Sequence, residues 1–262
     1  MLLKDKVVMI SGIGPGMGIK LAMEAAHEGA RAVAICARNE ARLEEAAQRI
    51  RALGSDCQVF HKATDVADAG ACKAFAEATQ GRFGRIDGLV NSAYVHGGFD
   101  PLADCPAGLL QEALDVNLFG SLNLTRAVLP QMQAQRSGAI VMVNTLGVFK
   151  PYAGGGAYAV SKGTLAVAVR YLAAELAGYG LRVNGLACGW MWGEPVQAHV
   201  RQAAAARGVS EEQLRAEFSA GIPGGRMPGD EECARAALFL VSDYASAING
   251  AQLDANGGEL MR

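Results

Sequence analysis

The chain has 262 residues, of which 51% are hydrophobic and 19% are charged, and its formal net charge is −2. That composition supplies enough apolar side chains for a large core and excludes an intrinsically disordered chain. A nearly balanced charge without a basic stripe argues against nucleic acid as the main partner.

The cysteines and the first residues indicate the compartment. The six cysteines are scattered without a C-x-x-C pair, and the four histidines are equally dispersed, so we expect neither a disulfide framework nor a metal site. The first apolar run, which follows Met1–Lys6, is too short for a secretion signal or a membrane span. We therefore expect a soluble, cytoplasmic protein without membrane insertion.

The first predicted unit is a strand, a glycine-rich loop and a helix. The strand is Val7–Ile10 and the loop is Ser11–Gly18. Three glycines of the loop fit the spacing G-x-x-x-G-x-G: Gly12, Gly16 and Gly18. The spacing G-x-G-x-x-G fails, because Met17 holds its last position. Glycines let backbone amides approach a pyrophosphate and the helix start adds positive charge, so nucleotide binding is favoured over a merely flexible turn.

The end of the second predicted strand bears on the choice of cofactor. The strand Ala32–Ala37 ends at Arg38, and a helix with charged positions follows through Arg51. In a dinucleotide fold the residue after this strand meets the adenosine ribose, where a carboxylate selects NAD and an arginine accommodates a 2′-phosphate. Arg38 therefore favours NADP, with NAD as the alternative if Arg38 is only a solvated residue at the helix start.

The rest of the chain continues this alternation. Further strands are predicted at Cys57–Lys62, Ile86–Asn91, Ala139–Asn144, Leu181–Ala187 and Ala251–Asp254. Further helices are predicted at Ala71–Phe83, Leu109–Met132 with an end near Pro130, Tyr158–Tyr179 and Cys233–Val241. Alternation of strand and helix predicts an α/β fold with a parallel sheet and helices on both faces. No linker or repeat divides residues 1–262, so we expect one domain.

The pair Tyr158 and Lys162 is the candidate for the chemistry. Residues four apart on a helix share a face, so the phenol and the ammonium project together. A free tyrosine has a pKa of about 10, and a nearby cation lowers it. Such a tyrosine can exchange a proton with an alcohol or ketone near neutral pH. The alternative is a surface pair without a role.

Taken together, the motifs resemble the short-chain dehydrogenase/reductase family across nearly the whole chain. They stand in the family's order: Ser11–Gly18, Asp65–Val66, Asn91–Ala93, Asn117, Tyr158–Lys162 and Asn256–Gly258. The resemblance implies a single-domain, Rossmann-type, doubly wound sheet of about seven strands with NAD(P) across the strand ends. It also implies that Tyr158 is the acid/base, that Lys162 holds the nicotinamide ribose, and that Asn117 anchors a water for proton relay.

The resemblance further implies a set of cofactor contacts. Asp65 would bind the adenine amino group, and Val66 would pack against the base. The other expected cofactor-binding residues are Gly12, Gly16, Met17, Gly18, Arg38, Asn91, Ser92, Ala93, Gly189 and Met191, besides Tyr158 and Lys162.

Several positions depart from the family pattern. The usual catalytic serine, thirteen residues before the tyrosine, is Thr145, which keeps the hydroxyl but adds a methyl group that narrows the site. We expect Thr145 to polarise the substrate oxygen, the alternative being that it merely ends a strand. Tyr94 follows the fourth strand, where it meets the cofactor or substrate mouth or simply packs. The usual proline before Gly189 is Cys188, and the usual threonine four residues after it is Gly193.

The substrate side corresponds to a lid at about residues 190–226. Both tryptophans, Trp190 and Trp192, stand at its start, which suggests an apolar, fairly bulky substrate, unless one of them packs within the lid. The expected partner is accordingly a small hydrophobic alcohol or ketone molecule. Two short helices are expected within it, Val196–Arg207 and Glu211–Ala220.

The helix Tyr158–Tyr179 is apolar almost all round, which is typical of a helix that is buried or packed on another subunit. The resemblance implies pairing through this helix and the one before it, as a homotetramer or a homodimer.

The leading hypothesis is an NADP(H)-dependent oxidoreductase that interconverts a hydrophobic secondary alcohol and its ketone, with the protein positioning and the cofactor carrying hydride. The alternative is a catalytically weak or inactive dinucleotide-binding protein, motivated by Thr145 and Cys188. An enoyl reductase is disfavoured, since related enzymes place tyrosine and lysine seven apart and position 165 is Leu165.

Overall fold

The computed structural model describes residues 1–262 and contains one parallel sheet. Its strands are β1 (Val7–Ser11), β2 (Ala32–Ala37), β3 (Gln58–Ala63), β4 (Gly88–Asn91), β5 (Gly138–Thr145), β6 (Leu181–Cys188) and β7 (Gln252–Ala255). Their order across the sheet is β3-β2-β1-β4-β5-β6-β7, and every neighbouring pair is parallel. The predicted single-domain α/β sheet of seven strands is confirmed.

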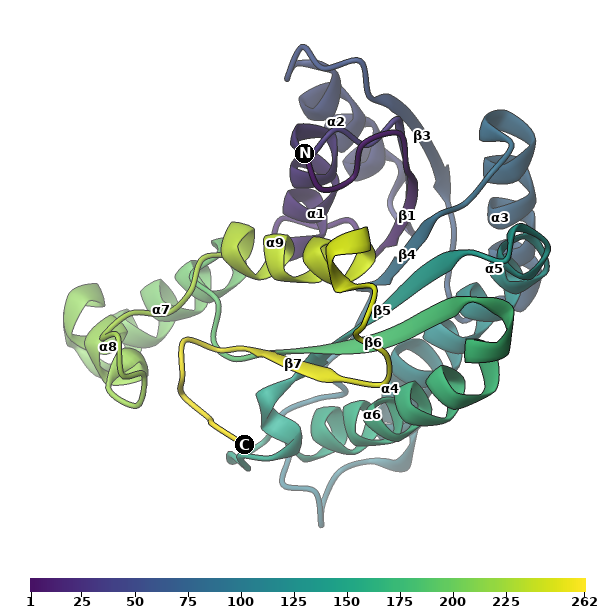
Figure 1. Ribbon diagram of the computed structural model, residues 1–262. Coiled ribbons are helices and arrows are strands. Elements are labelled where there is room, and N and C mark those ends of the chain that lie inside the picture. Colours follow the sequence, from purple (N-terminus) through teal and green to yellow (C-terminus); the bar gives the residue numbers. More distant parts are fainter.

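The helices cover both faces of the sheet (Figure 1). One face carries α1 (Met17–His27), α2 (Glu40–Arg51) and α9 (Asp230–Val241). The other face carries α3 (Ala69–Phe83), α5 (Ser121–Gln135) and α6 (Gly156–Leu176), with α4 (Ala107–Leu114) packed beside α6. Each face has its own apolar core. In β1, Val8 and Ile10 belong to the first core and Met9 to the second, as strand alternation requires.

The strand order reverses between β1 and β4. The chain moves outward from β1 to β2 and β3, and then returns to the other side of β1 with β4. Loops leave the carboxyl ends of β1 and β4 in opposite directions at such a point, so that a crevice opens between them. The fold therefore places the candidate site at this edge.

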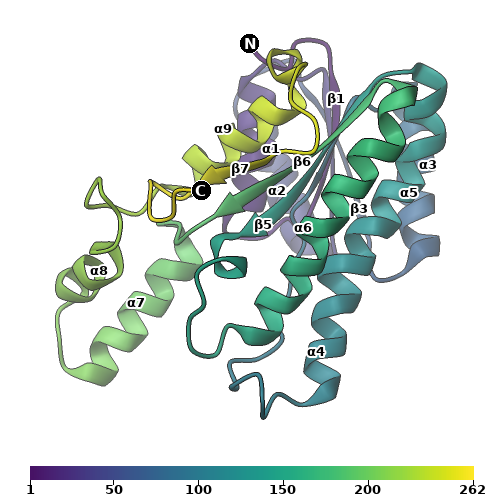
Figure 2. The same cartoon turned by 60° about the horizontal axis from the view of Figure 1, so that its bottom comes forward.

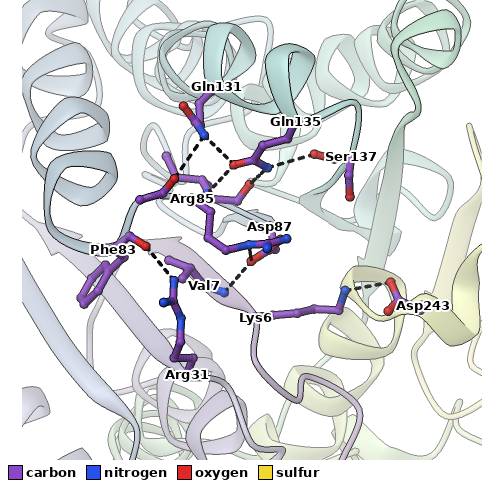
Figure 3. A network of polar contacts seen from close by, with 12 residues as sticks. Lys6, Val7, Arg31, Phe83, Arg85, Asp87, Gln131, Gln135, Ser137 and Asp243 are labelled. Atoms are coloured by element: carbon purple, nitrogen blue, oxygen red, sulfur yellow. Dashed lines mark hydrogen bonds and ion pairs between the residues drawn. The ribbon is translucent and has the colours of Figure 1, made fainter.

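A polar network closes the opposite edge of the sheet, where β1 and β4 begin (Figure 3). The carboxylate of Asp87, which is 5% exposed, accepts a hydrogen bond from the Val7 amide at 2.9 Å and pairs with Arg85. The side chain of Gln135 accepts from the amide of Ile86 and donates to its carbonyl. These buried polar groups satisfy one another, so the network fixes the register of β1 and β4 from the end away from the crevice.

The helix predicted at Leu109–Met132 is in fact three segments. Between α4 and α5 lies a π-helical turn, Asp115–Gly120, and α5 runs through Pro130 to Gln135. The predicted end near Pro130 is therefore wrong. The proline removes one amide donor, and the carbonyl that loses it belongs to Arg126, which is exposed and can be hydrated.

Two helices leave the body of the domain after β6. They are α7 (Glu194–Arg207) and α8 (Glu211–Ser219), and they project from the edge of the sheet near β6 and β7 (Figure 2). Their small core is their own, formed by Val200, Ala204 and Leu214. None of the helices in the structure combines the length and the apolar character needed to cross a membrane.

Candidate active site

A cavity of about 830 Å³ opens at the carboxyl edge of the sheet. It is lined by the glycine loop after β1, the ends of β2 and β3, the loop after β4, the segment from β5 into α6, and the loop after β6. Its volume lies within the range of small-molecule and cofactor sites. Nearly every residue predicted to act lies on its wall.

The glycine loop forms the floor of the cavity. Gly12 has φ +84°, and a Cβ on Gly18 would collide with the Gly12 carbonyl, so the turn and the start of α1 pack without side chains between them. The Ser11 hydroxyl accepts hydrogen bonds from the amides of Ser92 and Ala93, at 3.2 and 3.4 Å. Gly16 is the N-cap of α1 and has no side chain to cap it. The first amides of α1 are thus free to bind an anion.

Two arginines stand at the far end of the cavity. Arg38 follows β2 as predicted, and Arg42, which sequence reasoning missed, lines the same cavity. Asn39 caps α2 by accepting from the Arg42 amide at 3.1 Å, so Arg42 lies in the first turn of that helix and Arg38 stands just before it. The available signal for Arg42 was its place in the first turn of the helix that follows Arg38.

Tyr158 and Lys162 lie together on the α6 wall of the cavity. Lys162 is 1% exposed, and its ammonium lies 5.9 Å from the centre of the Tyr158 ring. The ammonium donates a hydrogen bond to the Val143 carbonyl at 2.7 Å. Burial lowers the pKa of Lys162 to about 8, an effect partly opposed by the neighbouring Cys188. The lysine is therefore a buried cation at neutral pH.

The expected lowering of the Tyr158 pKa is not found. Burial raises that pKa above its ordinary value, and the neighbouring Tyr94, Cys188 and Tyr152 raise it further. The physical reason lies in the surroundings of the phenol, which are other neutral acids and aromatic rings, while the lysine proton is directed at a carbonyl. The protein alone therefore holds Tyr158 as a neutral phenol at neutral pH.

Thr145 ends β5 and lines the cavity, in the place predicted for the catalytic hydroxyl. Its Oγ1 accepts a hydrogen bond from the Gly147 amide at 3.1 Å. A hydroxyl that accepts in this way keeps its own O–H as a donor. Thr145 thus has a fixed rotamer and one donor for a substrate oxygen.

Asn117 supports the wall from behind instead of lining it. It lies in the π-helical turn, is fully buried, and holds both backbone groups of Val95, accepting from its amide and donating to its carbonyl at 2.9 Å each. It also donates to the Ser161 hydroxyl at 2.8 Å, which in turn donates to the Tyr158 carbonyl. With these contacts its side chain positions the loop after β4 against α6.

Aromatic rings surround the phenol at the cavity mouth. The His96 ring stacks on Tyr158 at 5.2 Å and on Phe99 at 4.0 Å, and a ring nitrogen lies 3.3 Å from the Tyr152 hydroxyl. Tyr94 lies 5.8 Å from Tyr158, centre to centre, and lines the mouth. The mouth is apolar with a few polar tips, which is typical of a site for a small organic molecule.

The two tryptophans have different surroundings. Trp190 lines the cavity and stacks on Phe218 of α8 at 5.0 Å. Trp192 packs instead against the α7–α8 core, with the Arg215 guanidinium 4.4 Å from its ring. Only Trp190 bears on a ligand, so one of the two expected aromatics is structural.

Among the predicted site residues only the two asparagines do not line the cavity. Asn117 lies behind the wall and holds Val95. Asn91 is 1% exposed, with its amide nitrogen directed to Thr125 and Met142. The others are brought together on the wall: Gly12, Gly16, Met17, Gly18, Arg38, Asp65, Val66, Ser92, Ala93, Thr145, Tyr158, Lys162, Gly189 and Met191. Asp230 also lines it and was not predicted.

Comparison with known proteins places the chain. A family model described as enoyl-(acyl carrier protein) reductase matches residues 12–259. Levodione reductase of Leifsonia aquatica is 31% identical over 258 residues, which cover 97% of this chain and 94% of that protein. The chain belongs to the short-chain dehydrogenase/reductase family. D-Threitol dehydrogenase of Mycolicibacterium smegmatis, 36% identical over 269 residues, covers 98% of this chain and is itself covered to 93%.

Solved structures of the short-chain dehydrogenase/reductase family share the whole fold. The crystal structure of levodione reductase has a TM-score of 0.90 at 30% identity and covers 98% of each chain. NAD+-bound xylitol dehydrogenase has a TM-score of 0.89 at 27% identity, covering 98% of this chain and all of the other. An actinorhodin polyketide ketoreductase with NADPH has a TM-score of 0.88 at 27% identity, covering 97% of each. The chain is thus an oxidoreductase of this family, whose members use either cofactor.

Proposed function

We propose that this chain is an NADP(H)-preferring reductase and dehydrogenase that interconverts a hydrophobic secondary alcohol and its ketone. The proposal rests on one observation. Thr145, Tyr158 and Lys162 all line the cavity whose floor is the glycine loop. A hydroxyl donor, a proton carrier and a buried cation are the groups that this reaction requires of a protein.

The cavity fits a dinucleotide cofactor. Its floor is a cradle of glycines in which a Cβ at Gly18 would collide with backbone, and above it stand the free amides at the start of α1. Asp65 has one carboxylate oxygen on the Ala67 amide at 3.0 Å, and it lines the far end as a candidate for the adenine amino group. When bound, a nicotinamide cofactor supplies hydride transfer.

The protein's own residues supply orientation and the proton. In the reducing direction, Thr145 donates its O–H to the ketone oxygen, and Tyr158 gives that oxygen its proton. The buried charge of Lys162 compensates the phenolate that remains until a proton from solvent restores the phenol. In the oxidising direction the same phenolate accepts the alcohol proton.

The mouth supports a small, mainly apolar substrate, closed by the proposed lid of residues 190–226. Trp190, Phe99 and Tyr94 offer ring faces there. The polar groups on the lining include His96, Tyr152 and the ion pair of Lys150 with Glu259. The test is a panel of cyclic, aryl, terpene and steroid ketones and alcohols, read by absorbance of the reduced cofactor. Turnover of an apolar subset supports the proposal. Tight cofactor binding with no turnover across the panel would leave the alternative, a binding protein without activity.

The cofactor preference rests on the arginine pair. We expect Arg38→Ser with Arg42→Ser to weaken NADP+ binding by about 10- to 100-fold and to change NAD+ binding by less than about threefold, because only NADP+ carries a 2′-phosphate. Quenching of tryptophan fluorescence during titration measures both affinities. Arg49→Ser, on the exposed side of α2, is the matched control. Equal losses for the two cofactors, or tighter NAD+ binding by the native chain, would refute the preference.

An exposed apolar face on α6 supports a homo-oligomer. Val160, Val167 and Tyr171 are 39%, 45% and 66% exposed, and their spacing puts them on one side of the helix. We propose that this face packs on a second copy, in a homotetramer or homodimer. Val167→Glu should therefore lower the molecular mass measured by light scattering, whereas Tyr244→Ser, in the turn after α9, should not. A native chain that is monomeric at micromolar concentration would contradict the proposal.

The six cysteines are all free, as a reducing compartment permits. We propose the cytoplasm as the location.

A further inference from the structure

A buried carboxyl group without a hydrogen-bond partner on Oδ2 faces the cavity from α9. Asp230 is the first residue of that helix, is 3% exposed, and lines the cavity. No protein group donates to its Oδ2. An isolated buried carboxylate oxygen is costly, so its orientation toward the cavity requires an explanation that packing does not give.

The carboxyl group fills the space that a side chain at position 193 would need. A Cβ on Gly193 would overlap Oδ1 and Oδ2 of Asp230, so the glycine at this position is what admits the carboxyl group. On the other side, Oδ2 lies 3.7 Å from where a Cβ on Gly16 would stand. Gly16 is the N-cap of α1. Asp230 therefore stands beside the free amides at the start of α1, between the glycine loop and the root of the lid.

The groups around Asp230 do not balance the negative charge of its carboxylate. Those facing it are Lys20 on α1, Glu231 beside it on α9, Tyr94 after β4 and Cys188 at the end of β6. Lys20 is already paired with Glu231. Burial, together with Glu231, raises the pKa of Asp230 to about 6, while Lys20 opposes the shift. The carboxyl group is thus ready to take up a proton near neutral pH.

We propose that Asp230 is a cofactor-binding residue that acts as a neutral carboxylic acid, donating its O–H to a phosphate oxygen of the dinucleotide's diphosphate. The inference rests on the proposed function, since it requires a dinucleotide in the cavity. A diphosphate at the start of α1 brings negative charge next to Oδ2, and two anions in a site with little water repel each other. Protonation removes the repulsion and supplies the donor, with the proton taken from solvent on binding.

If Asp230 binds the diphosphate as a neutral acid, cofactor affinity falls as pH rises. Binding favours the protonated form of Asp230, so affinity is highest below its pKa and falls as pH rises above it. We expect the dissociation constants of NAD+ and ADP-ribose to rise by about tenfold between about pH 6 and about pH 7.5. Both ligands carry the diphosphate and lack the titrating 2′-phosphate. Calorimetry in two buffers of different ionisation enthalpy should show net proton uptake on binding.

Three variants separate this role from a structural one. Asp230→Asn keeps a donor without a charge, so its affinity should be independent of pH and about tenfold tighter than that of the native chain at about pH 7.5. Asp230→Ala should be independent of pH and weaker than Asp230→Asn. Glu231→Gln, one residue along, should keep the pH dependence and shift its midpoint down slightly, because Glu231 raises the Asp230 pKa.

Two results would overturn the proposal. One is native affinity that is flat over this range without proton uptake. The other is Asp230→Asn with the same slope as the native chain. Failure of the native chain to bind either ligand at any pH would instead refute the dinucleotide site itself, so the two failures are distinguishable.

Discussion

Replacing Tyr158 with phenylalanine should lower turnover by about 100- to 10,000-fold, the range found for loss of a general acid/base, with cofactor affinity nearly unchanged. The reason is specific to the hydroxyl. The ring of Tyr158 keeps its stacking with His96, so packing of the mouth survives the change. Steady-state rates with the best ketone of the panel, alongside fluorescence titration of the cofactor, measure the two effects separately. Turnover equal to that of the native chain would show that Tyr158 carries no proton.

Tyr94→Phe is the informative comparison, since that ring lies 5.8 Å from Tyr158 and loses the same atom. We expect its rate to change by less than about tenfold, because Tyr94 lines the mouth without carrying the proton. A loss of turnover as large as that of Tyr158→Phe would indicate that Tyr94 takes part in the proton transfer.

The raised pKa of Tyr158 also fixes the pH dependence of each direction. The reducing direction needs the neutral phenol, which burial favours, so its rate should stay level through neutral pH and fall only in alkali. The oxidising direction needs the phenolate, so its rate should climb with pH across the neutral range. Initial rates in both directions over one buffer series test this. An oxidation rate that is already at its plateau near neutral pH would mean that the bound cofactor lowers the phenol pKa strongly.

Replacing Lys162 with methionine should give a chain that is more stable and much less active. The pKa of Lys162 is lowered by burial from 10.5 to about 8, a shift worth roughly 3 kcal/mol against the folded state. Loss of the bond to Val143 offsets about 1 kcal/mol of the gain. The net increase of about 2 kcal/mol corresponds to a rise in Tm of about 4–8 °C. Cofactor affinity should fall by about 10- to 100-fold with the loss of the charged donor.

The stability gain of Lys162→Met has its own pH signature. The native chain carries the cost of the buried charge fully below about pH 8, and sheds it as pH rises from there toward the ordinary lysine value. The difference in Tm between variant and native chain should therefore shrink in alkali. Lys150→Met, whose ammonium is half exposed and paired with Glu259, should show no such gain. A Lys162→Met variant less stable than the native chain at neutral pH would refute the claim that the buried charge of Lys162 destabilises the folded state.

The sheet was predictable because its strands are buried on both faces. A strand such as Ala32–Ala37 is an unbroken apolar run that ends at polar residues, and its bounds were predicted to the residue. The π-helical turn around Asn117 was not predictable in the same way. One extra residue per turn leaves no mark on an apolar pattern, and the bonds that hold it come from Val95 and Ser161, far along the chain.

The site residues also differ in how well the sequence predicts them. Gly12, Tyr158 and Lys162 can be identified from the spacing of residues in short motifs, and in the structure they line one cavity. Asp230 has no such spacing, since only folding places α9 against Gly193. The direction of the Tyr158 pKa was also beyond the sequence. Spacing predicts that the lysine is near, but the balance between that cation and the loss of water depends on burial, which is a property of the fold.

The most direct test of the central claim is a crystal structure of the chain with NADP+ and a bound ketone from the panel. We expect the ketone oxygen to lie about 2.6–3.2 Å from the hydroxyls of both Tyr158 and Thr145. A ketone oxygen held elsewhere, with the Tyr158 hydroxyl out of reach, would contradict it.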